Sequence, residues 1–130
     1  MSLFEDLKTA LEAGAKTPRG ARAVAGHDED FELEVGKEVF HVGFQGGQLS
    51  INQGKSPRRE PLHFSRVQTD EATLRRILDG QISPVEAMEE GKLFLRTRLY
   101  GGALLTILLR SAYDLARERK LATPSPAGRG

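Results

Sequence analysis

The sequence contains no cysteine, which excludes disulfide scaffolds, thiolate metal sites and thiol catalysis. Its net charge of +1, from 19 basic and 18 acidic residues, gives no global attraction to nucleic acid or to anionic membranes. No apolar run approaches the roughly 18 residues needed to span a bilayer. Residues 2–14 carry acids early and lack the apolar segment of a secretory signal. We therefore expect a soluble cytoplasmic protein that binds no nucleic acid.

The composition is typical of one globular domain. The chain has 130 residues, of which 38% are hydrophobic and 28% charged. A chain of this length buries about two-thirds of its unfolded surface, so it can form a core without cross-links. We expect a single domain over residues 1–121. Residues 122–130, rich in proline, glycine and small side chains, are expected to be a disordered tail.

The first half of the chain predicts one helix and an antiparallel meander. Residues 2–13 form an amphipathic helix that begins at Ser2, and residues 15–30 show no clear period and are interpreted as a connector with at most a helical turn. In residues 31–35 apolar side chains alternate with Glu32 and Glu34, so one face is buried and the other solvated. Two further strands follow, joined by turns containing Gly36-Lys37 and Gly46-Gly47. The apolar face of this meander needs a cover.

A fourth strand, at about residues 62–68, has an awkward alternation. Leu62 and Phe64 point to one side and Val67 to the other, while Arg66 continues the Leu62 set. Either a bulge or a functional arginine explains this pattern, and the sequence does not choose between them.

Two short helices, a fifth strand and a long helix complete the chain. Thr69 is expected to cap a helix that ends at Gly80, and Ser83-Pro84 begins the next one. The final helix, from Gly101 to about Leu121, is apolar on almost every side between residues 103 and 109. Such a segment is either fully enclosed or in contact with something other than its own protein. Full enclosure of a terminal helix is difficult in so small a domain.

Residues 69–109 resemble the sterol carrier protein 2 family of non-specific lipid-transfer proteins. The matching pattern is a polar cap with an acidic helix start, a Leu-rich turn with glycine, a helix begun by proline, a Gly-Lys-Leu strand and an apolar last helix. Here these pieces are Thr69-Asp70-Glu71, Leu74 to Gly80, Ser83-Pro84, Gly91-Lys92-Leu93 and residues 103–109. Phe94 stands where the family usually has an exposed polar residue.

The resemblance implies an α/β fold of the α+β type, with a five-stranded, mostly antiparallel sheet covered by helices on one face. It also implies an apolar tunnel between the layers that binds fatty acids, acyl-CoA esters, sterol-like or isoprenoid lipids without chemistry. The inward side chains would line this tunnel; the alternative is that they simply form the core. They are Phe40, Val42, Phe44, Leu49, Ile51, Leu93, Leu95, Leu104, Leu105 and Leu108.

Arginines supply the candidate contacts to a lipid head group. Arg66, Arg96 and Arg98 could pair with a carboxylate or phosphate. The alternative is that they are solvated charges on the sheet, facing Glu32 and Glu34. The basic loop at residues 55–59 is either a transient contact to membrane lipid or an ordinary solvated loop.

No motif for catalysis, a metal or a cofactor is recognisable. His27 to Asp30 are consecutive and so are poorly placed to converge on one ion. His41 and His63 have no nucleophile–base pattern near them. We expect a non-enzymatic lipid carrier that needs no cofactor. The alternative is an interaction module, or a homodimer, that packs through residues 103–109 as an accessory to a lipid- or quinone-modifying enzyme.

Overall fold

The computed structural model describes residues 2–25, 28–57, 64–96 and 101–122, with the side chains of Phe64, 101–104 and Ala122 left out. Its helices are α1 (Leu3–Ala15), α2 (Pro18–Val24), α3 (Glu71–Leu78), α4 (Pro84–Glu89) and α5 (Gly101–Ala122). Its strands are β1 (Glu29–Val35), β2 (Glu38–Gln45), β3 (Gln48–Gln53), β4 (Phe64–Thr69) and β5 (Leu93–Arg96). The predicted tail lies outside the described residues, apart from Ala122 at the end of α5.

The strands form one open sheet in the order β3-β2-β1-β4-β5. β1 pairs in parallel with β4, and the other three pairings are antiparallel. This confirms the expected five-stranded, mostly antiparallel sheet. The turn between β2 and β3 depends on Gly46 and Gly47, whose φ angles of 61° and 77° are in the left-handed region that glycine adopts without strain.

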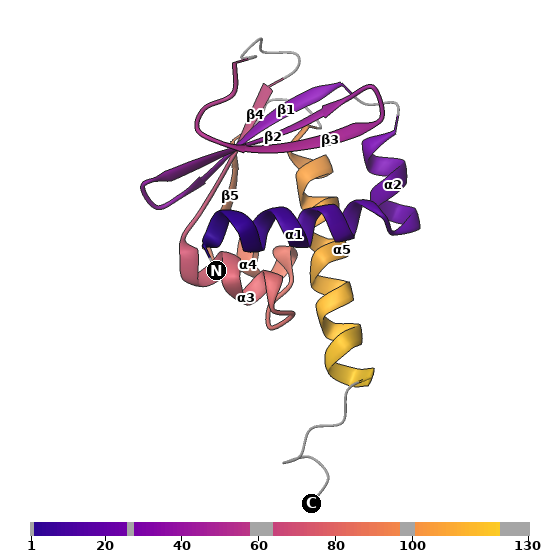
Figure 1. The fold of residues 1–130 in the computed structure, drawn as a ribbon. Helices are drawn as coiled ribbons and strands as arrows, with labels where there is room; N and C mark the ends of the chain where they lie inside the picture. Colours follow the sequence, from indigo (N-terminus) through magenta and orange to yellow (C-terminus); the bar gives the residue numbers. More distant parts are fainter. Residues whose placement is uncertain (1, 26–27, 58–63, 97–100, 123–130) are drawn as a thin grey trace, which may run out of the picture.

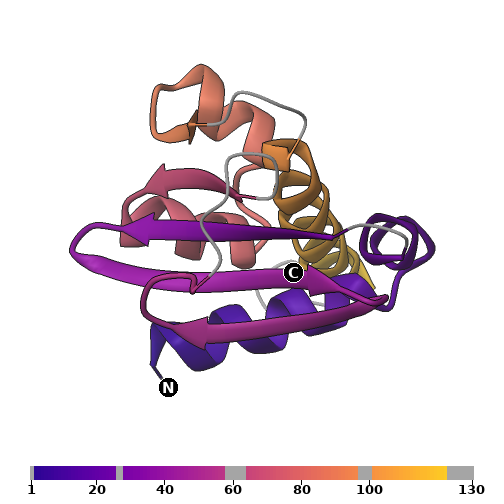
Figure 2. The ribbon, with the colours of Figure 1, turned by 90° about the horizontal axis from the view of Figure 1, so that it is seen from above.

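The helices lie on one face of the sheet, which we call the inner face; the opposite face is the outer face. Figure 1 shows the sheet above α1 and α3, with α5 running away from the sheet, and Figure 2 shows α1 directly beneath the strands. Phe31, Leu33 and Val35 of β1 point to the inner face and are at most 3% exposed. The alternation in the sequence predicted this face correctly.

The awkward alternation of β4 has a simple solution. Its pairing with β1 runs without a break from Asp30 opposite Phe64 to Val35 opposite Thr69, so there is no bulge. Val67 lies opposite Leu33 and is fully buried on the inner face, whereas Arg66 lies opposite Glu32 on the outer face. Leu62 lies outside the described residues.

Two helix starts differ from the prediction. Residues 18–24, interpreted as a connector, form α2: the Thr17 side chain accepts a hydrogen bond from the Gly20 N–H, and Pro18 begins the helix. The cap of α3 is Asp70 and not Thr69, because Thr69 is still paired in β4 while the Asp70 carboxylate accepts from the Thr73 N–H at 2.7 Å. This backbone hydrogen bond is the main cause of the lowered pKa of Asp70.

α5 is the longest helix, with 22 residues. Its first half faces the sheet and its second half carries charged side chains such as Arg117, Arg119 and Lys120. Within the described part of the chain, neither α5 nor any other helix is both long and apolar enough to cross a membrane.

Candidate functional site

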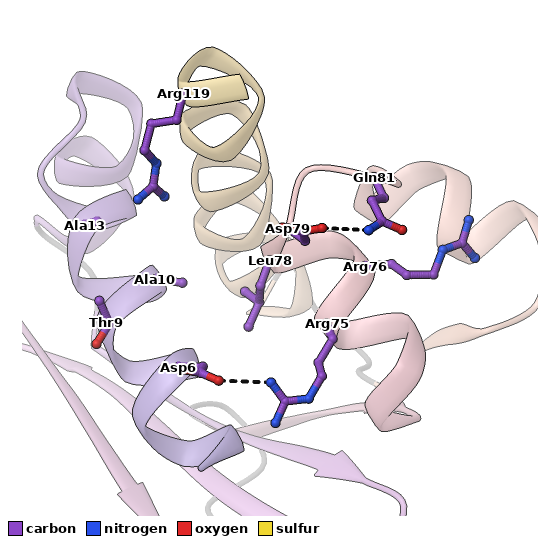
Figure 3. A pocket seen from close by; sticks show the side chains of 10 residues that line it. All are labelled: Asp6, Thr9, Ala10, Ala13, Arg75, Arg76, Leu78, Asp79, Gln81 and Arg119. Carbon is purple, nitrogen blue, oxygen red and sulfur yellow. Dashed lines mark hydrogen bonds and ion pairs between the residues drawn. The ribbon is translucent and has the colours of Figure 1, made fainter. Parts of the chain in front are cut away.

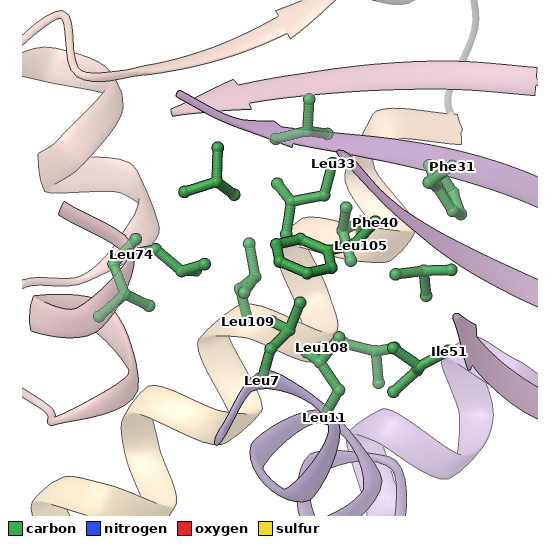
Figure 4. Close-up of a cluster of buried hydrophobic side chains, with 14 of the residues drawn as sticks. Leu7, Leu11, Phe31, Leu33, Phe40, Ile51, Leu74, Leu105, Leu108 and Leu109 are labelled. Atoms are coloured by element: carbon green, nitrogen blue, oxygen red, sulfur yellow. The ribbon is translucent and has the colours of Figure 1, made fainter. Parts of the chain in front are cut away.

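Most of the predicted lining residues meet in one layer between the inner face and the helices, which we call the apolar layer. Val42 lies opposite both Phe31 and Ile51, and Phe44 lies opposite Leu49, so the alternating side chains of three strands share one face. α5 brings Leu105 and Leu108 against them (Figure 4). Phe31 and Phe44 meet edge to face with ring centroids 5.3 Å apart, and Phe4 of α1 stacks on Phe40. The sequence therefore identified a real cluster.

The apolar layer is filled by protein atoms in the described part of the chain. Val42, Phe44, Leu105 and Leu108 are 0% exposed, so these side chains touch neither solvent nor a void that admits a water molecule. The other predicted members are also well covered, with Leu49 partly buried, Phe40 at 1%, Leu93 at 2% and Ile51 at 6%. The predicted tunnel is thus closed along these residues, and a ligand can enter only if the layer opens.

The enclosure of α5 corrects an expectation from the sequence. Leu105, Leu108 and Leu109 are fully buried by the chain itself, whereas Thr106 and Ile107 are partly buried, so the described part of this stretch is mostly enclosed. Its cover is α1, whose Leu7 and Leu11 lie beside Leu108 and are fully buried (Figure 4). α1 approaches closely because residue 14 is glycine: a Cβ there would lie 3.1 Å from the Leu108 carbonyl oxygen. The sequence could not show this contact, since about 90 residues separate the two helices.

Leu95 lies on the inner face but is not enclosed. It points inward, as predicted, and lies opposite Val67, yet it is 36% exposed because β5 is the edge strand. Its neighbour Phe94 is 47% exposed on the outer face. Leu104 belongs to α5, but its side chain lies outside the described residues. The edge of the sheet therefore presents two exposed apolar side chains.

The two described arginines among the proposed head-group contacts, Arg66 and Arg96, lie away from the apolar layer. Arg66 is on the outer face, with its Nε 3.5 Å from Glu34 and 3.8 Å from Glu32. Arg96 donates from Nε to the Gln68 side chain on the same face. This agrees with the alternative interpretation, charges that face Glu32 and Glu34. Arg98 lies outside the described residues, as do Arg58 and Arg59 of the basic loop.

The outer face is not uniformly solvated, which is a second correction. Glu32 is 1% exposed and Asp30 is 7% exposed, because residues 54–57 fold over them. The Ser56 N–H donates to Glu32 Oε2 and the Ser56 hydroxyl donates to Asp30 Oδ2, both at 2.9 Å. His41 Nε2 lies 3.3 Å from Asp30. We call Asp30, Glu32, His41 and Ser56 the outer polar cluster. The period-two alternation assigned Glu32 to solvent and gave no signal for the covering loop.

Within the described residues, no group of three or more His, Asp or Glu side chains is arranged to hold a metal ion. His27 lies outside those residues. His41 contacts Asp30. The hydrogen bonds that Ser56 donates to Glu32 and Asp30 hold residues 54–57 on the sheet. The outer polar cluster therefore has a structural role, which is to hold this loop in place.

Comparisons with solved structures show that the chain has the fold of sterol carrier protein 2. No family model matches the sequence, and no curated protein sequence matches it. Among solved structures, the solution structure of palmitated SCP2L2 from Aedes aegypti aligns with a TM-score of 0.61 at 20% identity, covering 84% of this chain and 95% of that one. A crystal structure of sterol carrier protein 2 aligns with a TM-score of 0.59 at 16% identity, covering 89% and 95%.

Two further solved structures that match this chain belong to proteins of other kinds. The ubiquinone synthesis protein UbiJ-SCP2 aligns with a TM-score of 0.58 at 15% identity, covering 84% of this chain and 90% of that one. The sec-alkylsulfatase Pisa1 from Pseudomonas sp. aligns with a TM-score of 0.54 at 18% identity over 68% of this chain. This chain spans only 13% of that sulfatase, so the fold also occurs as part of a longer protein.

Proposed function

We propose, from the sterol carrier protein 2 fold that this chain adopts, that the protein binds one lipid chain in the apolar layer and carries it without chemistry. The observation that carries the proposal is the combination of this fold with a continuous layer of apolar side chains contributed by β1, β2, β3, α1 and α5. A structure of the same fold is described as palmitated, which makes a fatty acyl chain the first ligand to test.

A lipid can enter the apolar layer only if the layer opens, and the contacts of α5 favour opening by movement of this helix. Its second half is held to α3 by polar contacts, from Arg117 to the Gly80 carbonyl and from Lys120 to Asp79. Its first half meets the sheet through leucines such as Leu105 and Leu108. Apolar contacts are non-directional, so a lipid chain can replace them with similar contacts of its own. Movement of the first half of α5 therefore exchanges one apolar neighbour for another.

The energetics allow binding of useful strength. Burying about a dozen methylenes contributes roughly 10 kcal/mol at about 0.8 kcal/mol each, before ordering costs. Micromolar affinity corresponds to about 8 kcal/mol. The affinity then depends on how little the opening of the layer costs, and one methylene more or less changes it only slightly. We expect a carrier with broad chain-length tolerance.

An engineered disulfide tests the opening directly. A Cβ at position 14 would lie 3.3 Å from Ser111 Cβ, slightly below the roughly 3.5–4.5 Å of disulfides, and the protein has no other cysteine. The double variant Gly14→Cys/Ser111→Cys should therefore form a bond between α1 and α5. We expect delipidated, oxidised protein to take up a fluorescent fatty acid far more slowly than the same protein after reduction.

The reduced double variant is the matched control, because it carries the same added Cβ beside the Leu108 carbonyl oxygen as the oxidised protein, and the single variant Ser111→Cys should bind as the wild type does. Equal uptake in the oxidised and reduced states would contradict opening between α1 and α5. If folded wild type takes up neither fatty acid, acyl-CoA nor sterol, the carrier function itself is wrong.

The proposal contains no chemical step and places the carrier in the cytoplasm. Incubation with an acyl-CoA should release no free thiol, and release above the uncatalysed rate would show an enzyme instead. Contact with a membrane during unloading would involve the exposed Lys55. Vesicles with and without anionic lipid should then differ in the rate at which they receive the fluorescent fatty acid.

The exposed edge of the sheet favours a second candidate function, an interaction module. Phe94 and Leu95 are 47% and 36% exposed on β5, and the fold also occurs in a ubiquinone synthesis protein. An edge strand with apolar side chains is a site at which another chain can add. Light scattering distinguishes the candidates: a dimer that dissociates in Phe94→Ser supports the module, whereas a monomer that takes up lipid supports the carrier.

A further inference from the structure

A groove of about 470 Å³ lies on the helical side of the molecule, between α1, α3 and the end of α5. No strand contributes to it, so it is separate from the apolar layer. We call it the helical groove (Figure 3). It is lined by Asp6, Thr9, Ala10, Ala13, Arg75, Arg76, Leu78, Asp79, Gln81 and Arg119.

The floor of the helical groove is apolar and one end is closed. Leu78 points into the space from α3, and Ala10 and Ala13 face it from α1 (Figure 3). The alanines leave room because their side chains end at Cβ. At the other end Arg75 donates from Nη1 to Asp6 at 2.9 Å and so bridges α3 to α1. The result is a short groove with an apolar floor, polar side chains around it and one blocked end.

The charges around the helical groove favour an anion. Three arginines and two aspartates line it, a balance of +1. Both acids are already engaged, Asp6 by Arg75 and Asp79 by Gln81 and Lys120. The hydrogen bond from Gln81, followed by the contact with Lys120, keeps the pKa of Asp79 below its usual value.

Arg119 is the lining cation best placed to meet a ligand, because Arg75 is engaged by Asp6 and Arg76 extends away from the alanines (Figure 3). Among the described residues it has no hydrogen bond or ion pair, and its guanidinium extends from α5 toward Ala13 across the groove (Figure 3). It stands at the end of the groove away from the Arg75–Asp6 bridge. An apolar floor that ends at an unpaired guanidinium suits a ligand with an apolar tail and an anionic head group.

We propose that the helical groove binds a single-chain anionic amphiphile, with the carboxylate on Arg119 and the hydrocarbon chain over Leu78 and the two alanines. The proposal goes beyond the carrier function, because it assigns a second lipid site that needs no opening of the sheet. The volume lies in the range of small-ligand pockets, roughly 300–1,000 Å³. A peptide fits less well, because helical walls use their backbone N–H and C=O groups internally and offer few to an extended chain.

Titration with decanoate, followed by amide NMR shifts of the full chain, tests the proposal. We expect shifts at Ala10, Ala13, Leu78 and Arg119. Ala10→Phe should fill the groove and abolish this response, whereas Lys8→Phe, at an exposed position of the same helix outside the groove, should leave it intact. Each variant's spectrum also reports whether the fold survives.

A second pair of variants tests the head group without changing the packing. Arg119→Gln should weaken decanoate binding about fivefold, the upper range for an exposed ion pair, and Lys8→Gln, with the same loss of charge, should not. Uncharged decanol should bind wild type and Arg119→Gln equally. Shifts confined to β2 and β3 would overturn the groove site while supporting binding in the apolar layer. Equal decanoate affinity in Ala10→Phe and Lys8→Phe would overturn it as well.

Discussion

Both faces of the sheet carry side chains that are almost completely buried, but different interactions hold them in place. On the inner face Val42, Phe44 and Leu108 are held by apolar contacts alone. On the outer face Glu32 and Asp30 are almost as deeply buried, but each is tied to Ser56 by a hydrogen bond of 2.9 Å. One face therefore depends on shape and the other on matched donors and acceptors.

This difference shows which face can exchange its neighbours. A leucine in the apolar layer loses little when a lipid methylene replaces a protein methyl group, because dispersion contacts do not depend on direction. A buried carboxylate has no such freedom, since loss of a donor leaves its charge desolvated. The geometry thus makes the inner face the exchangeable one and the outer face the rigid support. Three predictions test the contrast, from the largest effect to the smallest.

The largest effect is expected in the apolar layer. Leu108→Ala should lower the free energy of unfolding by about 2–5 kcal/mol, because it removes a fully buried side chain and leaves a cavity. Urea unfolding measures this loss. Leu121→Ala, at an 80% exposed position of the same helix, should change stability by less than about 0.5 kcal/mol. Similar losses in the two variants would show that α5 does not hold the core together.

The contribution of the outer polar cluster to stability should depend on its hydrogen-bonding groups more than on the size of its side chains. Glu32→Ala leaves the Ser56 N–H without its acceptor and should cost about 1–3 kcal/mol. Glu32→Gln keeps an acceptor oxygen in nearly the same shape and should cost less. Hydrogen exchange of the Ser56 amide is the direct measurement: it should accelerate in Glu32→Ala. Unchanged exchange would mean that residues 54–57 are held by other contacts.

The smallest effect concerns a polar contact at the surface of the helical layer. Asp70→Ala removes the cap of α3 and should cost about 0.5–2 kcal/mol, while Asp70→Asn keeps a cap. The folded pKa of Asp70 lies below the usual 3.8, so its contribution is present above that pH and is lost as the pH falls through the folded value. Stability measured from pH 6 to pH 2 should fall less in Asp70→Asn than in wild type; parallel curves would contradict this.

Local pattern predicted much of the fold. The alternation of apolar side chains assigned the correct face to every strand of the meander, and Gly36-Lys37 and Gly46-Gly47 marked its turns. The misses have local causes. The sequence predicts a connector over residues 15–30, but Thr17 caps α2 and Pro18 begins it. Thr69 is predicted to cap α3 because threonine suits that position, but it is still a strand residue whose hydroxyl donates to the Lys92 carbonyl.

The candidate site was predicted only as a set of residues. Phe40, Val42 and Leu108 do meet, as their apolar character and period indicated. Their closure depends on Leu7 and Leu11, which come from the other end of the chain. Periodicity shows which side of an element is apolar and cannot show which distant element covers it.

The amino-acid sequence by itself determined most of the elements, their apolar faces and the resemblance to a lipid-carrying fold, because these depend on neighbours within a few residues. Only the tertiary structure decided that α1 seals α5, that a loop buries Glu32 and that three helices leave a groove beside Arg119. Those outcomes depend on contacts between segments tens of residues apart, whose distances are fixed by packing and not by any local preference.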